Sequence, residues 1–207
     1  MSETAPETPL WQPSELQAAT TNMGRFMTEV EQRWAEEIPD YAALHQWSVN
    51  RREDFWTTVW DFCGVRAATR GKVGLRNGEA MPGAEWFPEA RLNFAENLLR
   101  GEGGEPAIIF WGEDKVKRNL SHDDLNGAVS RLQQALRAQG VGVGDRIAGF
   151  LPNLPETVIA MLAATSLGAV WSSCSPDFGI QGVLDRFGQI EPKILFVADG
   201  YFYGGKE

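Results

Sequence analysis

Cysteine is scarce in this sequence, which has two among its 207 residues, Cys63 and Cys174. They lie far apart and form no CxxC pair, so neither a disulfide framework nor a cysteine zinc site is expected. Such usage is typical of a reducing compartment. The N-terminal stretch MSETAPETPL is acidic and polar and lacks the apolar segment that directs export. Together these features predict a cytoplasmic protein.

The sequence also has few long apolar runs and few positively charged residues. The longest apolar run, IAMLAATSLGAVW, is interrupted by Thr165, Ser166 and Gly168, so no membrane partner is expected. The 19 Lys and Arg are outnumbered by 28 Asp and Glu, for a net charge of −9. This balance disfavours nucleic acid as a partner, because binding to phosphates needs a basic face. The basic clusters at 51–52 and 115–118 are interpreted as solvated surface.

What the sequence does contain is enough apolar material for a core, 43% of residues with eight Trp, arranged in two patterns. Residues 1–12 are expected to form a disordered tail. Residues 13–104 are predicted to be mainly helical, with helical spacing of Phe26, Val30 and Trp34. The predicted helix boundaries in this half are a capping box at Ser14 and Gln17, a stop at Pro39, caps at Asp40 and Asn50, and a start at Pro88.

From residue 105 strands alternate with helices. Strands are expected over 107–114, 145–152, 169–174 and 193–199, with a hairpin return before Ser121. Helices are expected after a Ser121 cap, after an Asn153 cap with Pro155 in the first turn, and over 180–189. Alternation at this length predicts an α/β fold with a parallel sheet. The chain stops straight after a strand, which suggests a truncated domain.

The common catalytic motifs are missing. GxSxG and the Walker loop GxxxxGK[ST] do not occur. GVGVGD at 140–145 follows a helix and precedes a strand, the wrong order for a dinucleotide site, and is interpreted as a helix stop and tight turn. Cys174 would need a base to act as a nucleophile, and the two His residues, His45 and His122, are not expected near it. Cys174 is therefore interpreted as a small buried thiol.

The stretch SSCSPDFG at 172–179 lies where a parallel strand is expected to end and a helix to begin. Ligands of open α/β sheets bind at this edge, and small side chains there leave room for one. Asp177 is predicted to cap the helix that begins near Gly179, leaving backbone N–H groups for an anion. The same residues are equally consistent with a tight packing corner, so spacing leaves both interpretations open.

Several longer segments, WFPEARLNFAEN, LPNLPETVIAMLA, WSSCSPDFG and RFGQIEPK, together resemble the acyl-adenylate-forming enzymes. The last two resemble most closely their acetoacetate–CoA ligase branch, and the resemblance runs from about Pro13 to the end. It implies a helical N-terminal leader followed by the first βα units of a truncated adenylate-forming large domain. In this family a carboxylate attacks the α-phosphate of ATP to form an acyl-adenylate and diphosphate. The thiol of CoA then displaces AMP to give a thioester.

The resemblance implies acetoacetate, ATP and CoA as small-molecule partners, with Mg²⁺ assisting the first step. The family's phosphate loop, ATP motifs and catalytic lysine all lie beyond residue 207, so no catalytic residue is assigned and the chain alone is expected to be inactive. Carried over by position, CoA contacts fall at Ser175, Pro176 and Asp177, and at Tyr203 and Lys206. Asp177 stands where relatives have glycine, and Tyr203 where they have arginine.

Two other functions remain as alternatives. The chain could belong to an acetyl- or propionyl-CoA synthetase, which shares the first two segments, or it could be a non-catalytic α/β binding module. The residues that select the acyl group lie outside this chain in the family, so acyl specificity rests on the resemblance. The sequence carries no prediction of oligomeric state.

Overall fold

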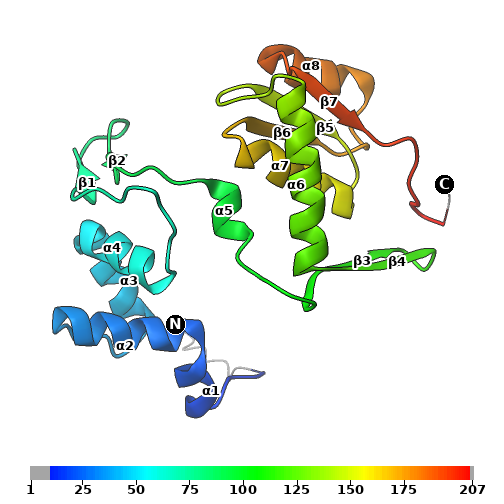
Figure 1. Cartoon of the computed structure of the whole chain (residues 1–207). Coiled ribbons are helices and arrows are strands. Elements are labelled where there is room, and N and C mark those ends of the chain that lie inside the picture. The colour runs from blue at the N-terminus through cyan, green and yellow to red at the C-terminus, as the bar shows by residue number, and fades with distance from the viewer. Residues whose placement is uncertain (1–9, 206–207) are drawn as a thin grey trace, which may run out of the picture. The chain divides into compact units, whose positions relative to one another are not determined.

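The computed structural model describes residues 10–205, which fall into two compact units, 1–90 and 91–207 (Figure 1). The predicted tail at 1–12 lies mostly outside the described residues. The first unit contains α1 (Glu15–Thr20), α2 (Asn22–Trp34), α3 (Tyr41–Asn50) and α4 (Arg52–Phe62). A two-residue antiparallel pairing follows, between β1 (Leu75–Arg76) and β2 (Glu85–Trp86). The domain boundaries expected from the sequence remain a prediction.

The core of the first unit is aromatic. Its buried side chains come from α2, α3 and the segment between them: Phe26, Val30, Ile38, Leu44 and Trp47. Ring pairs within this unit meet edge to face, as aromatic quadrupoles prefer, for example Phe26 and Phe55 with centroids 5.8 Å apart. Polar bonds cross the same helices. Thr58, fully buried in α4, accepts a hydrogen bond from Trp34 Nε1 at 2.8 Å and donates to the Asp54 carbonyl at 2.7 Å.

Asp61, near the end of α4, joins two arginines. Its carboxylate accepts from Arg33 at 2.8 Å and from Arg70 at 2.6 Å. Partial burial of the carboxyl acts to raise its pKa, but the hydrogen bonds and charges of the two guanidinium groups outweigh this and hold the pKa below its ordinary value. The pair therefore ties the loop after α4 to α2.

The second unit begins with α5 (Phe94–Leu98) and an antiparallel hairpin of β3 (Pro106–Gly112) and β4 (Val116–Ser121). Then come α6 (His122–Ala138), β5 (Arg146–Phe150), α7 (Pro155–Ser166), β6 (Val170–Cys174), α8 (Ile180–Ile190) and β7 (Ile194–Val197). β5, β6 and β7 form a parallel sheet in the order β6-β5-β7. The predicted α/β class with a parallel sheet is confirmed.

Alternate residues of the central strand β5 define the two faces of this sheet. Ile147 belongs to a core cluster with α6 and α7, whereas Ala148 packs with Cys174 and Phe187 of α8. The first cluster is rich in small residues, including Ala163 and Ala164, both without exposed surface. On β5 itself, Gly149 is required by a close neighbour, because a Cβ there would lie 2.7 Å from the Trp171 ring. The sheet is thus covered by α6 and α7 on one face and by α8 on the other.

Local helix signals were mostly correct in this unit. Ser121 caps α6 as predicted and forms a capping box with Asp124, and hydrogen bonds from Ser121 lower the pKa of Asp124 below its ordinary value. Gly140 adopts φ 75° after α6. The following turn at 140–145 is closed by Asp145, which accepts from the Gly142 N–H at 2.8 Å, so the turn interpretation of GVGVGD is confirmed.

Four predicted helix boundaries are wrong. The second helix ends at Trp34, before Pro39, because Ala35 takes a left-handed φ of 53°. Asn50 is the last residue of α3 and no cap, since its side chain accepts from Gln46 one turn earlier. Pro88 lies in a turn closed by the Ala90 N–H to Phe87 carbonyl bond, and the next helix starts after an Asn93 cap.

Asn153 is the fourth. The N-cap of α7 is Leu154, which makes no side-chain cap bond. The segment before α7 is held instead by Thr157, whose hydroxyl donates to the Pro152 carbonyl at 2.7 Å. Pro155 does lie in the first turn of the helix, as predicted.

Candidate functional site

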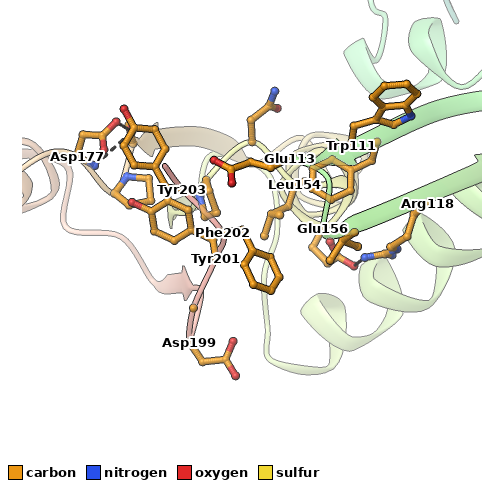
Figure 2. Close-up of a pocket in the computed structure, with 18 residues that line it drawn as sticks. Trp111, Glu113, Arg118, Leu154, Glu156, Asp177, Asp199, Tyr201, Phe202 and Tyr203 are labelled. Atoms are coloured by element: carbon orange, nitrogen blue, oxygen red, sulfur yellow. Dashed lines mark hydrogen bonds and ion pairs between the residues drawn. The ribbon is translucent and has the colours of Figure 1, made fainter. Parts of the chain in front are cut away.

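A cavity of about 570 Å³ opens at the carboxyl edge of the parallel sheet. It is formed by four segments of the second unit: 110–118 of the β3–β4 hairpin, 152–156 at the start of α7, 175–177 after β6 and 199–203 after β7 (Figure 2). Because parallel strands present their carboxyl ends at the same edge, the segments after β6 and β7 meet there. Four of the five predicted site residues, Ser175, Pro176, Asp177 and Tyr203, line this cavity. Lys206 lies outside the described residues.

The turn after β6 is stabilised by its own side chains. Ser175 Oγ donates to Asp177 Oδ2 at 2.9 Å and accepts from the Asp177 N–H at 3.3 Å. Asp177 therefore does not cap α8, and this prediction is wrong: the N-cap is Gly179, with no side-chain cap bond. A serine two residues earlier offers the carboxylate a nearer partner than the helix N–H groups. Asp177 remains an exposed carboxylate on the cavity wall.

Cys174 precedes this turn and is buried, with 4% of its surface exposed. The cavity lining among the described residues includes neither Cys174 nor a histidine. The interpretation of Cys174 as a packed thiol and no nucleophile is therefore supported by its surroundings, where it contacts Ala148 and Phe187.

The wall formed by 199–203 is aromatic. Tyr201, Phe202 and Tyr203 all line the cavity, and the rings of Tyr201 and Tyr203 lie with centroids 6.4 Å apart. Tyr203 is 69% exposed, so most of its ring is open to a ligand. A flat, exposed ring of this kind can stack on a planar heterocycle.

The opposite wall comes from the hairpin, and sequence reasoning missed it. Trp111 is 66% exposed, with Lys117 Nζ 4.4 Å from its ring centroid. Arg118, interpreted from the sequence as solvated surface, pairs with Glu156 of α7 at 2.7 Å. The aromatic residues of the strand at 107–114 were the only local sign in the sequence of a possible binding surface. Nothing in the order of the residues indicates that this hairpin lies beside the edge of the parallel sheet.

Most of the charged groups of the cavity are acidic. Among the described lining residues, Glu113, Glu156, Asp177 and Asp199 carry carboxylates, and Arg118 carries the one guanidinium. In the view of Figure 2, Asp177 and Tyr203 lie at one end and the Arg118–Glu156 pair at the other. Residues 10–205 contain no cluster of three or more His, Cys, Asp or Glu that could hold a metal ion. The cavity thus combines aromatic surfaces with one locally paired cation.

No helix within residues 10–205 has both the length and the apolar character needed to cross a bilayer. This finding is consistent with the interruptions seen in the longest apolar run of the sequence.

Known protein families match parts of both units. A family described as AMP-binding enzyme matches residues 94–205, more than half of the chain, and one described as acetyl-coenzyme A synthetase N-terminus matches residues 41–98. An acetoacetyl-coenzyme A synthetase from Rhizobium meliloti (strain 1021) is 55% identical over 200 residues, covering 97% of this chain and 31% of that protein. An acetoacetyl-CoA synthetase from Xenopus tropicalis is 40% identical, covering 90% and 28%.

A solved structure agrees with these relatives. The acetoacetyl-CoA synthetase from Streptomyces lividans superposes with a TM-score of 0.91 at 44% identity, over 97% of this chain and 32% of that one. The chain therefore spans about a third of the length of the proteins that it matches.

Proposed function

Because this chain belongs to the AMP-binding enzyme family, we propose that it forms the first third of an ATP-dependent acetoacetate–CoA ligase. The observation that carries the proposal is the 55% identity to an acetoacetyl-CoA synthetase over nearly the whole chain. The complete enzyme would join acetoacetate to CoA with conversion of ATP to AMP and diphosphate. The identities to acetoacetyl-CoA synthetases disfavour an acetyl- or propionyl-CoA synthetase, and family membership disfavours a binding module.

ATP and Mg²⁺ are proposed to bind mainly to the two thirds of the enzyme that this chain does not span. No phosphate loop occurs here, and the described residues offer no metal cluster. The second unit would supply the sheet edge against which the ATP-binding parts of the complete enzyme pack. A cytoplasmic location is proposed from the cysteine usage, which is typical of a reducing compartment.

CoA is the ligand proposed for the cavity after β6 and β7. The aromatic wall suits the adenine, with Tyr203 exposed for stacking. The phosphates fit less readily, because four carboxylates line the cavity beside one guanidinium. Lys206 is proposed as the cation for the phosphates, and the Asp177 carboxylate, which accepts a hydrogen bond from Ser175, is not proposed to contact them. We thus propose that the site binds the nucleotide end of CoA more by stacking on the adenine than by ionic contacts with the phosphates.

The test of the activity is expression of the complete reading frame that contains these residues. Diphosphate release and thioester formation are measured with acetoacetate, acetate and propionate in turn. We expect acetoacetate to be used with the highest kcat/KM. A preference for acetate or propionate would favour the alternative synthetases, and no reaction with any acid would contradict an enzyme. Residues 1–207 alone are expected to support no acetoacetate-dependent ATP–diphosphate exchange.

The CoA site is tested in that protein by Tyr203→Ala and Lys206→Ala. Loss of the Tyr203 ring is expected to raise the KM for CoA about threefold to tenfold, since an aromatic contact contributes about 0.5–1.5 kcal/mol. Tyr203→Phe should retain most of the affinity because it keeps the ring. Tyr41→Ala, which removes a comparably exposed tyrosine from the first unit, is the control. An unchanged KM for CoA in both test variants would remove the assignment.

A further inference from the structure

The tip of the β3–β4 hairpin is bonded to the chain that follows β7. Glu113 Oε1 accepts from the Gly204 N–H at 2.6 Å, and Glu113 Oε2 accepts from the Gly205 N–H at 3.0 Å. The partners are 91 and 92 residues apart in sequence. Both oxygens of one carboxylate therefore hold two successive amides, and bonds to a charged acceptor are stronger than neutral ones.

The backbone of the glycine pair is shaped for this contact. Gly204 and Gly205 have φ of 59° and 76°, the left-handed region in which side chains are strained. A Cβ at either position would meet no atom within 4 Å, so conformation and not crowding requires glycine here. Successive amides in such turns point toward a common side and form an anion-binding concavity. In this structure the anion is the side chain of Glu113.

Glu113 itself occupies a position that would suit glycine better. Its φ is 53°, again left-handed, at the turn between β3 and β4. Glutamate is uncommon in this region, where glycine and asparagine are preferred. A carboxylate at such a position, bonded to the chain that follows β7, indicates a role for the side chain beyond forming the turn.

Tyr203 is the residue that this contact would position. It immediately precedes Gly204 and is 69% exposed, so packing alone restrains its ring little. Figure 2 shows the Glu113 carboxylate directed toward the side of the cavity where Tyr203 lies. Fixing the backbone next to Tyr203 reduces the freedom that the ring would lose when a ligand stacks on it.

We propose that Glu113 is a positioning residue for CoA, which holds the Tyr203 ring in place through the Gly204 and Gly205 amides. The inference rests on the proposed CoA site. Glu113 itself does not contact the phosphates in this proposal, because its carboxylate is negative and both of its oxygens are occupied by amides. Its effect on CoA is transmitted by the backbone of the glycine pair.

The first experiment measures the tether without any ligand. In the complete protein, Glu113→Gly relieves the left-handed strain at the turn while removing the carboxylate, so the hairpin is expected to fold as well as before. Hydrogen–deuterium exchange of the Gly204 and Gly205 amides should become about tenfold faster, the factor expected for loss of a charge-assisted hydrogen bond. Asp114→Asn removes the same charge from the adjacent residue of the turn and should leave the exchange unchanged.

The second experiment measures the effect on CoA. Glu113→Gly is expected to raise the KM for CoA about threefold, while kcat and the KM values for ATP and acetoacetate stay near those of the wild type. Glu113→Gln keeps one acceptor oxygen and should fall between wild type and Glu113→Gly in both exchange and KM. In the double variant Glu113→Gly with Tyr203→Ala, the loss of the tether should have little further effect, because the ring that it positions is gone.

Three outcomes would overturn the proposal and remain distinguishable. Unchanged amide exchange in Glu113→Gly would mean that the carboxylate does not hold the glycine pair. Faster exchange with an unchanged KM for CoA, while Tyr203→Ala raises that KM, would leave the CoA site standing and remove the positioning role. Faster exchange with no effect of either variant on CoA would overturn the CoA site together with the inference built on it.

Discussion

The two units of this chain reach buried cores by different means. The first unit packs large aromatic side chains edge to face and crosses its helices with polar bonds, such as that from Trp34 to Thr58. The second packs alanines and aliphatic residues closely between helices and a parallel sheet, with Ala163, Ala164 and Ile147 fully buried. Only the second brings the carboxyl ends of parallel strands together. The difference teaches that the aromatic share of a core is no guide to where a candidate ligand site lies.

The largest effects are expected from truncating the core of each unit. Ile147→Ala in the second unit and Phe26→Ala in the first should each lower the free energy of unfolding by about 3–4 kcal/mol, the usual cost of such cavities. Hydrogen exchange with mass spectrometry under denaturant reports both units separately. We expect each variant to accelerate exchange mainly in its own unit. Equal acceleration in both would break the division of the chain into two units.

The polar bonds of the first unit provide a second test. Thr58→Val leaves the Trp34 Nε1–H without its acceptor in a buried place and should cost about 2 kcal/mol. Thr28→Val is the matched control, because Thr28 also donates one turn back, to the Gly24 carbonyl, but is exposed. It should change stability by less than about 0.5 kcal/mol. Similar losses in both variants would show that the aromatic core does not depend on its crossing bond.

Two helix caps of the same kind, one in each unit, should have unequal effects on stability. Ser14 and Ser121 each form a capping box, but Ser14 begins the six-residue α1, which has no buried residues, whereas Ser121 begins the 17-residue α6. Ser121→Ala should lower the free energy of unfolding by about 1 kcal/mol. Ser14→Ala should leave the global unfolding transition unchanged, because fraying of α1 exposes no core. Equal losses in a thermal or urea titration would contradict this ranking.

The smallest effects are expected from acid. In the first unit, bonds from Arg33 and Arg70 lower the pKa of Asp61. In the second, the Gly142 N–H and then Lys193 lower the pKa of Asp145. A lowered pKa means that, as pH falls, the carboxylate becomes protonated at a lower pH in the folded state than in the unfolded chain. The stabilisation is therefore complete above the ordinary value of 3.8 and is lost as pH falls through the lowered pKa.

Urea titrations of Asp61→Asn and Asp145→Asn between pH 5 and pH 2, followed by exchange in each unit, measure this loss. Each variant should show a weaker pH dependence than the wild type, confined to its own unit. A variant that keeps the full acid dependence would mean that other carboxylates dominate the response of that unit.

The sequence predicted those features whose partners lie within a few residues. The Ser121 cap and the turn at 140–145 were predicted correctly, because the interactions that form each lie within one turn of chain. Asn50 and Asp177 were assigned wrongly as caps for a related reason. Each has a competing partner nearby, Gln46 and Ser175 respectively, and spacing alone does not rank the two.

About half of the candidate site could be predicted from the sequence. The rule that ligands bind beyond the carboxyl ends of parallel strands located 175–177, and the family resemblance added Tyr203; the cavity includes both. The hairpin wall with Trp111, Glu113 and Arg118 was not foreseen, because β3 and β4 form a sheet of their own and their place follows from long-range packing. The bonds from Glu113 to residues 91 and 92 positions further on have no counterpart in local sequence pattern.

Asn93 has a consequence for the order in which the second unit can form during synthesis. Its Oδ1 caps α5 at the Glu96 N–H, while its Nδ2 donates to the carbonyls of Thr165 and Ser166 at the end of α7, 72 and 73 residues later. A ribosome adding roughly 5–20 residues per second needs several seconds to supply those acceptors. Until then the five-residue α5 has a cap but lacks α7, which holds Asn93 and packs with Ala95. The nascent chain should therefore hold 93–98 open and close it only once α7 has emerged.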